Sequence, residues 1–317
     1  ITKNFLIKEI STDIGIDPNY VKFEDNDIEY LIDNFTFEPG VRELKRKLES
    51  IYLKLNLDRI YKKGVFENSD PNNILIKKEH IDSYLNKPNL NIKKIHDVDD
   101  IGIISGLYAT NSGSGGIIPI LIYPNFLGTK NKFLLKLTGS QGKVMKESVH
   151  FAFTTAMNLI KNEFRQQFLE SHPFGLHIHT PDGATPKDGP SAGSAFTTAF
   201  VSRILNKKIK KDVAMTGEIE MNGNITAIGG LEYKLKGAQK AGVKIAFVPF
   251  DNKEDLDKIY EKDDSIKKDI SIHLVKHISE ILKLALIEDT NVKTRGRKKK
   301  SEILFDPSIY LNNQFLL

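Results

Sequence analysis

The sequence predicts an α+β protein in which a helical first part precedes a domain of mixed strands and helices. In the first ninety or so residues, apolar side chains such as Leu44, Leu48, Ile51 and Leu55 recur at helical spacing. From about Ile101 onward, short β-rich stretches alternate with helical ones, a mixture typical of α+β or α/β domains.

The elements expected after residue 100 follow one another along the chain. Strands are expected at 117–123, 133–138, 174–180, 245–249 and 270–275, and helices at 144–169, 191–205, 231–241 and 277–286. Asn222-Gly223 predicts a hairpin between 213–219 and 225–228. Gly242 is a typical residue for ending the helix expected at 231–241. The helix that contains Leu44 is expected to stop at Gly64.

Length and composition are those of a soluble globular protein. The chain has 317 residues, 40% of them hydrophobic and 27% charged, which fits about two domains. No apolar run approaches the roughly 18 residues of a membrane helix, and no secretory signal opens the chain. Because the first residue is Ile1 rather than Met, a fragment of a longer protein is expected. The absence of cysteine excludes disulfides, a cysteine nucleophile and thiolate metal sites.

The net charge of +5 comes from one late basic run. Six lysines and arginines lie in residues 293–300, and the rest of the chain has a net charge of −1. This pattern favours a solvated tail over a nuclear-localisation or nucleic-acid signal. A cytoplasmic protein is therefore expected, with a nuclear location and a nucleic-acid partner left open.

The densest chemical motif is the segment PKDGPSAG at residues 186–193. Its glycines and prolines form a loop that leads into a helix of small residues, so Ser191 is expected near the start of that helix. Unpaired backbone N–H groups and the positive end of the helix dipole lie there and suit a developing oxyanion. The alternative is that Ser191 is only an N-cap.

A nucleophilic serine needs a base, and a lysine serves if burial keeps it neutral. Lys234 lies in the amphipathic segment after Gly229-Gly230-Leu231, beside small residues that would let it point inward. Periodicity alone favours the opposite, a lysine exposed to solvent.

Four motifs in order resemble the Lon proteases, which use a Ser–Lys dyad. They are the PKDGPSAG loop, the preceding segment HIHTPDGAT at 177–185, MTGEI at 215–219 and IGGL at 228–231. The resemblance places the nucleophile at Ser191 and the base at Lys234, three residues after IGGL. It covers almost the whole chain to about residue 288 and implies an ATP-dependent serine endopeptidase that degrades proteins through an acyl-enzyme.

The first segment resembles the small all-α lid subdomain of an AAA+ ATPase, which precedes the proteolytic domain in this family. The resemblance assigns Arg42, in Glu38-Pro39-Gly40-Val41-Arg42, to the position that contacts bound nucleotide. An arginine suits phosphate oxygens because it stays charged and binds them as a fork. The Walker motifs are absent from this sequence, so ATP with Mg is expected only for the full-length protein, as is a homohexamer.

Five further residues are expected to support the site. Thr216 ends a strand and offers a hydroxyl that would orient the lysine, and Glu218 would face the same side. His177 and His179 lie two apart on a strand, near the catalytic groove by resemblance, with no third ligand that would make them a metal site. Asp188 is an acid beside the nucleophile, and in the family it contacts the lysine in inactive states.

The expected boundaries are a lid at 1–88, a linker at 89–100, the proteolytic domain at 101–288 and a basic tail at 289–317. The sequence departs from the family at Asp182, where glutamate is usual, and at residues 109–116 (ATNSGSGG), where an aromatic residue is usual. Because this second segment flanks the active site in the family, substrate preference is expected to differ.

Rival interpretations remain open at this point. Residues 189–193 also fit G-x-S-x-G, the nucleophile elbow of α/β-hydrolases, with His273 or His277 downstream as the base. Ser140 and Lys143 fit S-x-x-K, although the companion motifs are missing. A non-enzymatic, Lon-like scaffold is the third alternative.

Overall fold

The computed structural model describes residues 1–36, 40–67, 70–86, 94–110, 113–128, 132–181 and 187–288. The chain divides into two compact units, one made mainly of Ile1–Asn91 and the other of Ile92–Thr110 and Ser114–Leu317. The basic run at 293–300 lies outside the described residues.

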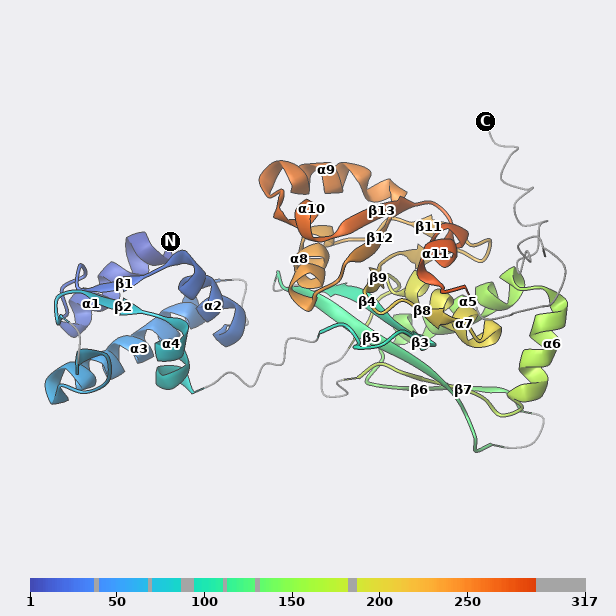
Figure 1. The fold of residues 1–317 in the computed structure, drawn as a ribbon, viewed down its shortest axis with the longest axis horizontal. Coiled ribbons are helices and arrows are strands. Elements are labelled where there is room, and N and C mark those ends of the chain that lie inside the picture. The colour runs from blue at the N-terminus through green and yellow to red at the C-terminus, as the bar shows by residue number, and fades with distance from the viewer. Residues whose placement is uncertain are drawn as a thin grey trace, which may run out of the picture. The chain divides into compact units, whose positions relative to one another are not determined.

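The first unit is helical with one small ribbon (Figure 1). Its elements are a short π-helical turn at Thr2–Leu6, α1 (Ile7–Ile14), β1 (Val21–Phe23), α2 (Asp25–Phe35), α3 (Arg42–Tyr61), a 3₁₀ turn at Gly64–Phe66, β2 (Ile74–Ile76) and α4 (Lys78–Leu85). The expectation of an all-α unit needs one correction, because β1 and β2 pair in parallel. Each strand buries its first and third residues, so both add apolar side chains to the helical core.

Helix α3 forms the centre of this unit. The predicted stripe of Leu44, Leu48, Ile51 and Leu55 is buried along one face, as expected. The helix ends at Tyr61 and is closed by Lys62, which adopts the left-handed conformation at φ 49°. It therefore stops slightly before Gly64.

The second unit is built around a seven-stranded sheet. The strands of the whole unit, including those of its smaller sheets, are β3 (Asp100–Ile101), β4 (Ile103–Ala109), β5 (Gly115–Pro124), β6 (Leu134–Thr138), β7 (Gly175–His179), β8 (Lys208–Ile209), β9 (Val213–Met215), β10 (Glu218–Ile219), β11 (Ile225–Thr226), β12 (Ile245–Pro249) and β13 (Ser271–Val275). Its helices are α5 (Lys143–Leu159), α6 (Asn162–Ser171), α7 (Gly193–Leu205), α8 (Leu231–Ala241), the 3₁₀ turn Phe250–Asn252, α9 (Lys253–Lys262), α10 (Ser265–Asp269) and α11 (Ile278–Ala285).

The large sheet has the strand order β13-β12-β9-β4-β5-β7-β6. Strands β13, β12, β9 and β4 run parallel, whereas β5 is antiparallel to both β4 and β7. The segments that follow β9, β12 and β13 therefore emerge at one edge of the sheet, where the β4–β5 hairpin also turns. Functional side chains commonly gather at this carboxyl edge of parallel strands.

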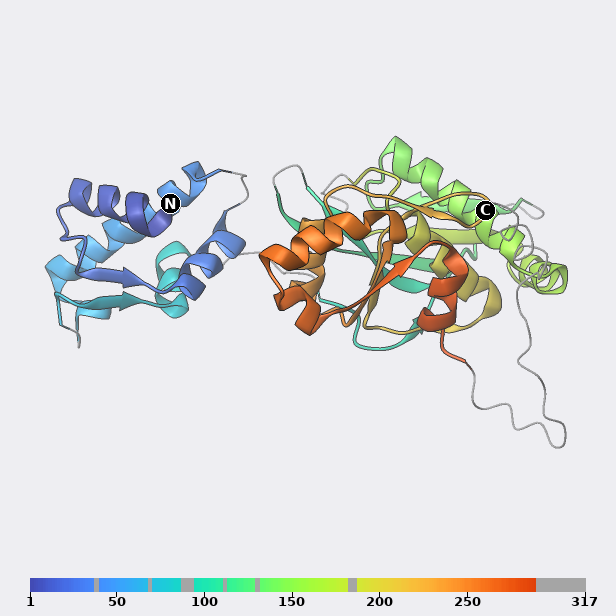
Figure 2. The same ribbon diagram turned by 90° about the horizontal axis from the view of Figure 1, so that it is seen from above.

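The sheet separates two hydrophobic clusters, since successive strand residues point to opposite faces. On one face, Met215 and Phe247 pack with α5, α7 and α11, and on the other, Ala214 and Val248 pack with α8, α9 and α10. Figures 1 and 2 agree that α8, α9 and α10 gather on the side of the sheet away from α5 and α6.

Two predicted elements differ from the structure. The single helix expected at 144–169 is broken between α5 and α6, because Ile160 and Lys161 adopt extended ψ angles of 141° and 146°. The break redirects α6 so that its Phe168 meets the ring of Phe133 edge-on. The stretch 213–219 belongs to two strands, with β9 in the large sheet and β10 in the predicted hairpin with β11.

Helix α8 lies directly on the backbone of β5, because both elements carry glycine at the contact. A Cβ on Gly115 would lie 2.0 Å from the carbonyl oxygen of Tyr233, and one on Gly237 would lie 2.2 Å from the amide nitrogen of Gly116. Real Cβ atoms do not approach backbone so closely, so only glycine permits this spacing.

Candidate active site

Ser191 lies at the mouth of α7 and is half-buried. Its carbonyl oxygen accepts hydrogen bonds from Gly217 N at 2.8 Å and from Thr216 Oγ1 at 3.2 Å. On the adjacent turn, a Cβ on Gly193 would lie 2.8 Å from the side chain of Ile219. The start of α7 is therefore fixed against the segment that follows β9.

The backbone N–H groups around Ser191 fall into two pairs. Gly193 N donates to Pro190 O at 3.0 Å, and Ser194 N donates to Gly217 O at 3.0 Å. Within the described part of the chain, the N–H groups of Ser191 and Ala192 make no hydrogen bond. Both residues directly precede α7, at the positive end of its helix dipole, and backbone donors at such a position suit an oxyanion.

Lys234 lies on α8 and is only 4% exposed. The exposed lysine that periodicity favours is therefore wrong, and the inward one is right. The reason is the glycine contact with β5, which presses the first turns of α8 onto the sheet. Burial lowers the pKa of Lys234 to about 8 because it disfavours the charged ammonium.

Thr216 joins the two candidate residues. It follows β9 directly, is completely buried, and accepts a hydrogen bond from Lys234 Nζ at 3.2 Å. Its own hydroxyl donates to Ser191 O. Among the hydrogen bonds of the described residues, none runs directly from Lys234 Nζ to Ser191 Oγ. One threonine hydroxyl thus ties the amine to the backbone of the serine.

Asp188 binds the start of α5 rather than Lys234. Its Oδ1 accepts backbone N–H groups from Met145 at 2.8 Å and from Gly189 at 2.9 Å, and these bonds lower the pKa of the carboxyl. Met145 lies in the first turn of α5, so Asp188 fastens the nucleophile loop to the start of that helix. No hydrogen bond or ion pair among the described residues joins it to Lys234.

His177 and His179 both contact one hydroxyl on the neighbouring strand. Thr138 Oγ1 lies 2.8 Å from His177 Nε2 and 2.7 Å from His179 Nδ1. Burial, more than the nearby Lys136, lowers the pKa of His177. Within the described ranges, no three His, Cys, Asp or Glu side chains are grouped so as to hold a metal ion. The pair cross-links β6 and β7.

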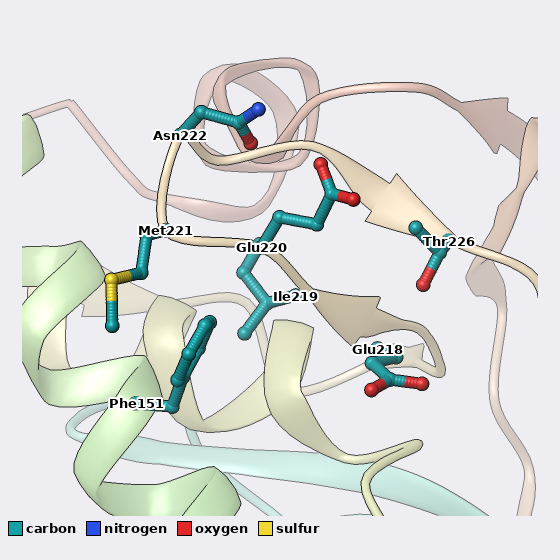
Figure 3. Close-up of a pocket in the computed structure, with 7 residues that line it drawn as sticks. All are labelled: Phe151, Glu218, Ile219, Glu220, Met221, Asn222 and Thr226. Carbon is teal, nitrogen blue, oxygen red and sulfur yellow. The ribbon is translucent and has the colours of Figure 1, made fainter.

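Glu218 follows Gly217 in the chain and lines a shallow, open pocket (Figure 3). The lining residues are Phe151, Glu218, Ile219, Glu220, Met221, Asn222 and Thr226. In Figure 3 the Phe151 ring lies beneath Ile219 and Met221, whereas the carboxylates of Glu218 and Glu220 lie apart from this apolar group. The pocket therefore offers an apolar floor with negative charge beside it.

The histidines and the Ser–Lys pair required by the rival interpretations make contacts elsewhere in the fold. His277 caps α11, where its Nδ1 accepts from Ser279 N and its Nε2 lies 3.0 Å from Asn222 O. His273 contacts Ser271 Oγ at 3.3 Å. Among the hydrogen bonds of the described residues, neither histidine is bonded to Ser191, and residues 187–190, directly before Ser191, do not form the buried strand of a nucleophile elbow. Ser140 and Lys143 are both exposed.

In the first unit, Arg42 occupies the first position of α3 and is exposed. Glu38 and Pro39 of the same motif lie outside the described residues, as does Asp182 near the serine loop. No helix in the described part of the chain has the length and apolarity needed to cross a membrane.

Sequence reasoning missed the residues that position Lys234 from outside its own helix. Gly115 on β5 sets how closely α8 approaches the sheet, and a buried Asn252 binds the segment in front of α8. The paired glycines at 115–116 indicate that another backbone comes close to this strand. The sequence does not show that this backbone belongs to α8. Nothing in the sequence marked Asn252.

Comparisons with known proteins identify two domains in the chain. Residues 75–288 match the C-terminal proteolytic domain of Lon protease (S16), and residues 12–64 match the Lon AAA+ ATPase lid domain. A Lon protease homolog of Acanthamoeba polyphaga mimivirus is 45% identical over 89% of this chain and 33% of its own length. Lon proteases of Dictyoglomus thermophilum and Buchnera aphidicola are 34% and 36% identical, over 95% and 90% of this chain and 36% and 35% of their own lengths. The chain thus spans about a third of the curated relatives it matches.

Proposed function

This chain belongs to the Lon protease family, and from that premise we propose that Ser191 and Lys234 form a catalytic dyad for peptide-bond hydrolysis. The observation that carries the proposal is the burial of Lys234 beside Thr216, whose hydroxyl also binds the carbonyl of Ser191. A buried amine that one threonine hydroxyl links to the backbone of the serine supports a Ser–Lys mechanism, which needs a base close to the nucleophile.

The protonation state of Lys234 supports the role of a base. With its pKa lowered to about 8, a substantial fraction of the amine is neutral at mildly alkaline pH. Thr216 Oγ1 accepts one N–H of that amine. A neutral amine held by one N–H keeps its lone pair for a second partner, and we assign the Ser191 hydroxyl to it. Attack requires Oγ to come within about 3 Å of Nζ when substrate is bound.

The first half of the reaction acylates the serine. Ser191 Oγ bonds to the scissile carbonyl carbon while its proton passes to Lys234 Nζ, and the carbonyl oxygen becomes an oxyanion. The N–H groups of Ser191 and Ala192 are the assigned donors to that oxyanion. The C–N bond then breaks, the protonated lysine gives its proton to the leaving amine, and an ester remains on Ser191.

The second half returns the enzyme to its starting state. Neutral Lys234 takes a proton from a water molecule that attacks the ester carbonyl, and the same N–H groups hold the second oxyanion. Collapse expels Ser191 Oγ, which recovers the proton from Lys234, and the carboxylic product leaves. No cofactor is needed in either half.

We assign substrate side chains to the pocket beside Gly217 (Figure 3). Its apolar floor of Phe151, Ile219 and Met221 suits an extended, apolar stretch of an unfolded protein. Glu218 and Glu220 favour a basic side chain in the same stretch because they bring negative charge to the pocket. Protein substrates are thus the proposed class, and their sequences remain to be selected by experiment.

In the full-length protein we propose ATP-dependent proteolysis by a homohexamer. Nucleotide hydrolysis, which requires Mg, would supply the work of unfolding substrates. The lid is proposed as 1–88, the linker as 89–100 and the proteolytic domain as 101–288. Arg42 fits a phosphate contact, because its exposed guanidinium stands at the N-terminus of a 20-residue helix. The rest of a nucleotide site would come from residues outside this sequence.

The test is hydrolysis of a fluorogenic peptide and of unfolded casein by the chain, by Ser191→Ala and by Lys234→Ala. Both substitutions are expected to abolish turnover, while His277→Ala and His273→Ala are expected to leave it near the level of the unmodified chain.

Three other outcomes would contradict the proposal. Activity in Lys234→Ala with loss in His277→Ala or His273→Ala would favour a histidine-based triad. Absence of cleavage, with no effect of Ser191→Ala, would favour a scaffold. Activity in Ser191→Ala would exclude this serine as the nucleophile.

A further inference from the structure

Asn252 is a buried amide that serves a distant backbone rather than its own helix. It ends the 3₁₀ turn Phe250–Asn252 after β12 and is only 3% exposed. Its Oδ1 accepts from Ile228 N at 2.9 Å, and its Nδ2 donates to Ile228 O at 2.9 Å. One side chain thus binds both polar groups of one backbone residue, as a neighbouring strand would.

Asp255 fixes the orientation of this amide. Its Oδ2 accepts the second N–H of Asn252 Nδ2 at 2.9 Å. An amide turned the other way would put its oxygen against both this carboxylate and the Ile228 carbonyl. Because an amide offers donors at only one end, the carboxylate settles which end faces Ile228 N.

Ile228 begins the short lead-in to the lysine helix. It is followed by Gly229 and by Gly230, which adopts φ 69° and precedes the first residue of α8. The carbonyl of Gly230 accepts the backbone N–H of Lys234 at 3.1 Å. The position of this lead-in, residues 228–230, therefore sets where the first turn of α8 begins. It thereby also sets how deeply Lys234 Nζ is buried.

The lead-in is held at the same edge of the sheet as the catalytic residues. Asn252 follows β12, Thr216 follows the adjacent β9, and both strands run parallel. The first turn of α8 also meets β5, where Gly115 touches the Tyr233 carbonyl. The first turn is thus held at two points, by β5 against its backbone and by Asn252 at its start.

We propose that Asn252, oriented by Asp255, is a positioning residue for Lys234, acting through the backbone of Ile228 and the Gly229–Gly230 lead-in. The inference rests on the proposed role of Lys234 as the general base. Without the amide, Ile228 N–H and C=O lose their partner, the lead-in recruits water, and Nζ loses its fixed depth.

Burial connects this geometry to a measurable pH profile. It alone lowers the pKa of Lys234, with no charged side chain contributing. Titratable side chains on α8 and on elements in contact with it include Tyr108 on β4 and, on α8 itself, Tyr233 and Glu232, which pairs with Lys236 at 2.9 Å and with Lys262 of α9 at 3.6 Å. A variant that admits water to Nζ should therefore raise the pKa of the Lys234 amine without altering any charged partner.

The test measures kcat and KM for a fluorogenic peptide from pH 6 to pH 11, using Asn252→Ala, Asp255→Asn and the matched control Asn125→Ala. Asn125 also binds a backbone carbonyl, Phe174 O at 3.4 Å, but at the end of β5 away from Gly115. In Asn252→Ala we expect kcat to fall on the order of tenfold or more, with little change in KM and a midpoint displaced to higher pH. Asp255→Asn should act in the same direction but less, and Asn125→Ala should match the parent chain.

A second measurement needs no turnover. The ¹³Cε signal of Lys234, identified by its absence in Lys234→Met, gives the midpoint of the amine directly in each variant. A midpoint and kcat unchanged in both Asn252→Ala and Asp255→Asn, even with a lower melting temperature, would overturn the inference and leave the amide a purely structural group. Hydrolysis that survives Lys234→Ala would instead refute the proposed function.

Discussion

The substitution Gly115→Ala places a methyl group where α8 already touches the sheet. The added Cβ would lie 2.0 Å from the Tyr233 oxygen, 2.4 Å from its carbonyl carbon and 3.0 Å from Lys234 N. All three neighbours are backbone atoms, so no side chain is free to move aside. Helix α8 must retreat by more than about 1 Å before the contact reaches an ordinary van der Waals distance.

That retreat carries Lys234 with it. A displacement of about 1 Å at a reacting group costs on the order of 100-fold in rate, and overpacking of this kind costs about 1–3 kcal/mol of stability. We therefore expect kcat/KM for a fluorogenic peptide to fall by about two orders of magnitude while the chain still folds, as checked by circular dichroism and thermal unfolding.

Gly106→Ala on the neighbouring strand β4 is the matched control. A Cβ there meets Ile120 Cδ1 at 3.5 Å and Ala195 Cβ at 3.8 Å, which are ordinary contacts. This variant is expected to keep the activity of the parent chain. If Gly115→Ala also kept it while Lys234→Ala was inactive, the close approach of α8 to β5 would not be what positions the lysine.

Other measurements follow from the same geometry. Peptide hydrolysis should rise with pH through about 8, because the pKa of Lys234 is lowered to about 8 and only the neutral amine accepts a proton; a rate that falls over this range would exclude the amine as base. Lys234→Met should stabilise the inactive chain at pH 7 by as much as about 3 kcal/mol in urea unfolding, because at that pH the native state carries the full cost of a buried charge. This gain should shrink between pH 8 and 10.5, where the native state binds fewer protons than the unfolded one, and a constant gain would show that Lys234 is not desolvated. Asp188→Ala should lower the melting temperature at neutral pH, because the start of α5 loses its acceptor, while the ¹³Cε midpoint of Lys234 stays unchanged. In the parent chain that contribution from Asp188 should fade as pH falls below the ordinary carboxyl pKa of 3.8, because its own pKa is lowered.

Local patterns in the sequence predict the helices well where one face is apolar and a glycine marks the end. The predicted helix at 231–241 has the observed bounds of α8, and Gly242 closes it in the left-handed conformation at φ 88°. The same patterns miss β1 and β2, since strands of three residues carry little periodicity and these two pair across more than fifty residues. They also merge α5 and α6, because the apolar spacing continues through the break at Ile160.

In the candidate site, too, local patterns predict some features and miss those that depend on distant contacts. The position of Ser191 before a helix follows from its loop of glycine and proline, which is a local signal. The burial of Lys234 does not, because it depends on glycines of a strand more than a hundred residues away. The contacts of Asp188 with Met145 and of Asn252 with Ile228 are likewise side chain–backbone bonds between distant segments, which no local pattern specifies.

The proposed nucleophile and the proposed base come from opposite sides of the seven-stranded sheet. Ser191 precedes α7 in one layer, Lys234 belongs to α8 in the other, and they meet at Thr216, where β9 ends. Neither layer alone contains a complete pair. Under the proposed mechanism, a chain still emerging from synthesis, or one that has lost either layer to local unfolding, lacks the pair needed to cleave a peptide bond. The three-layer architecture therefore permits hydrolysis, under the same mechanism, only in a fully assembled domain.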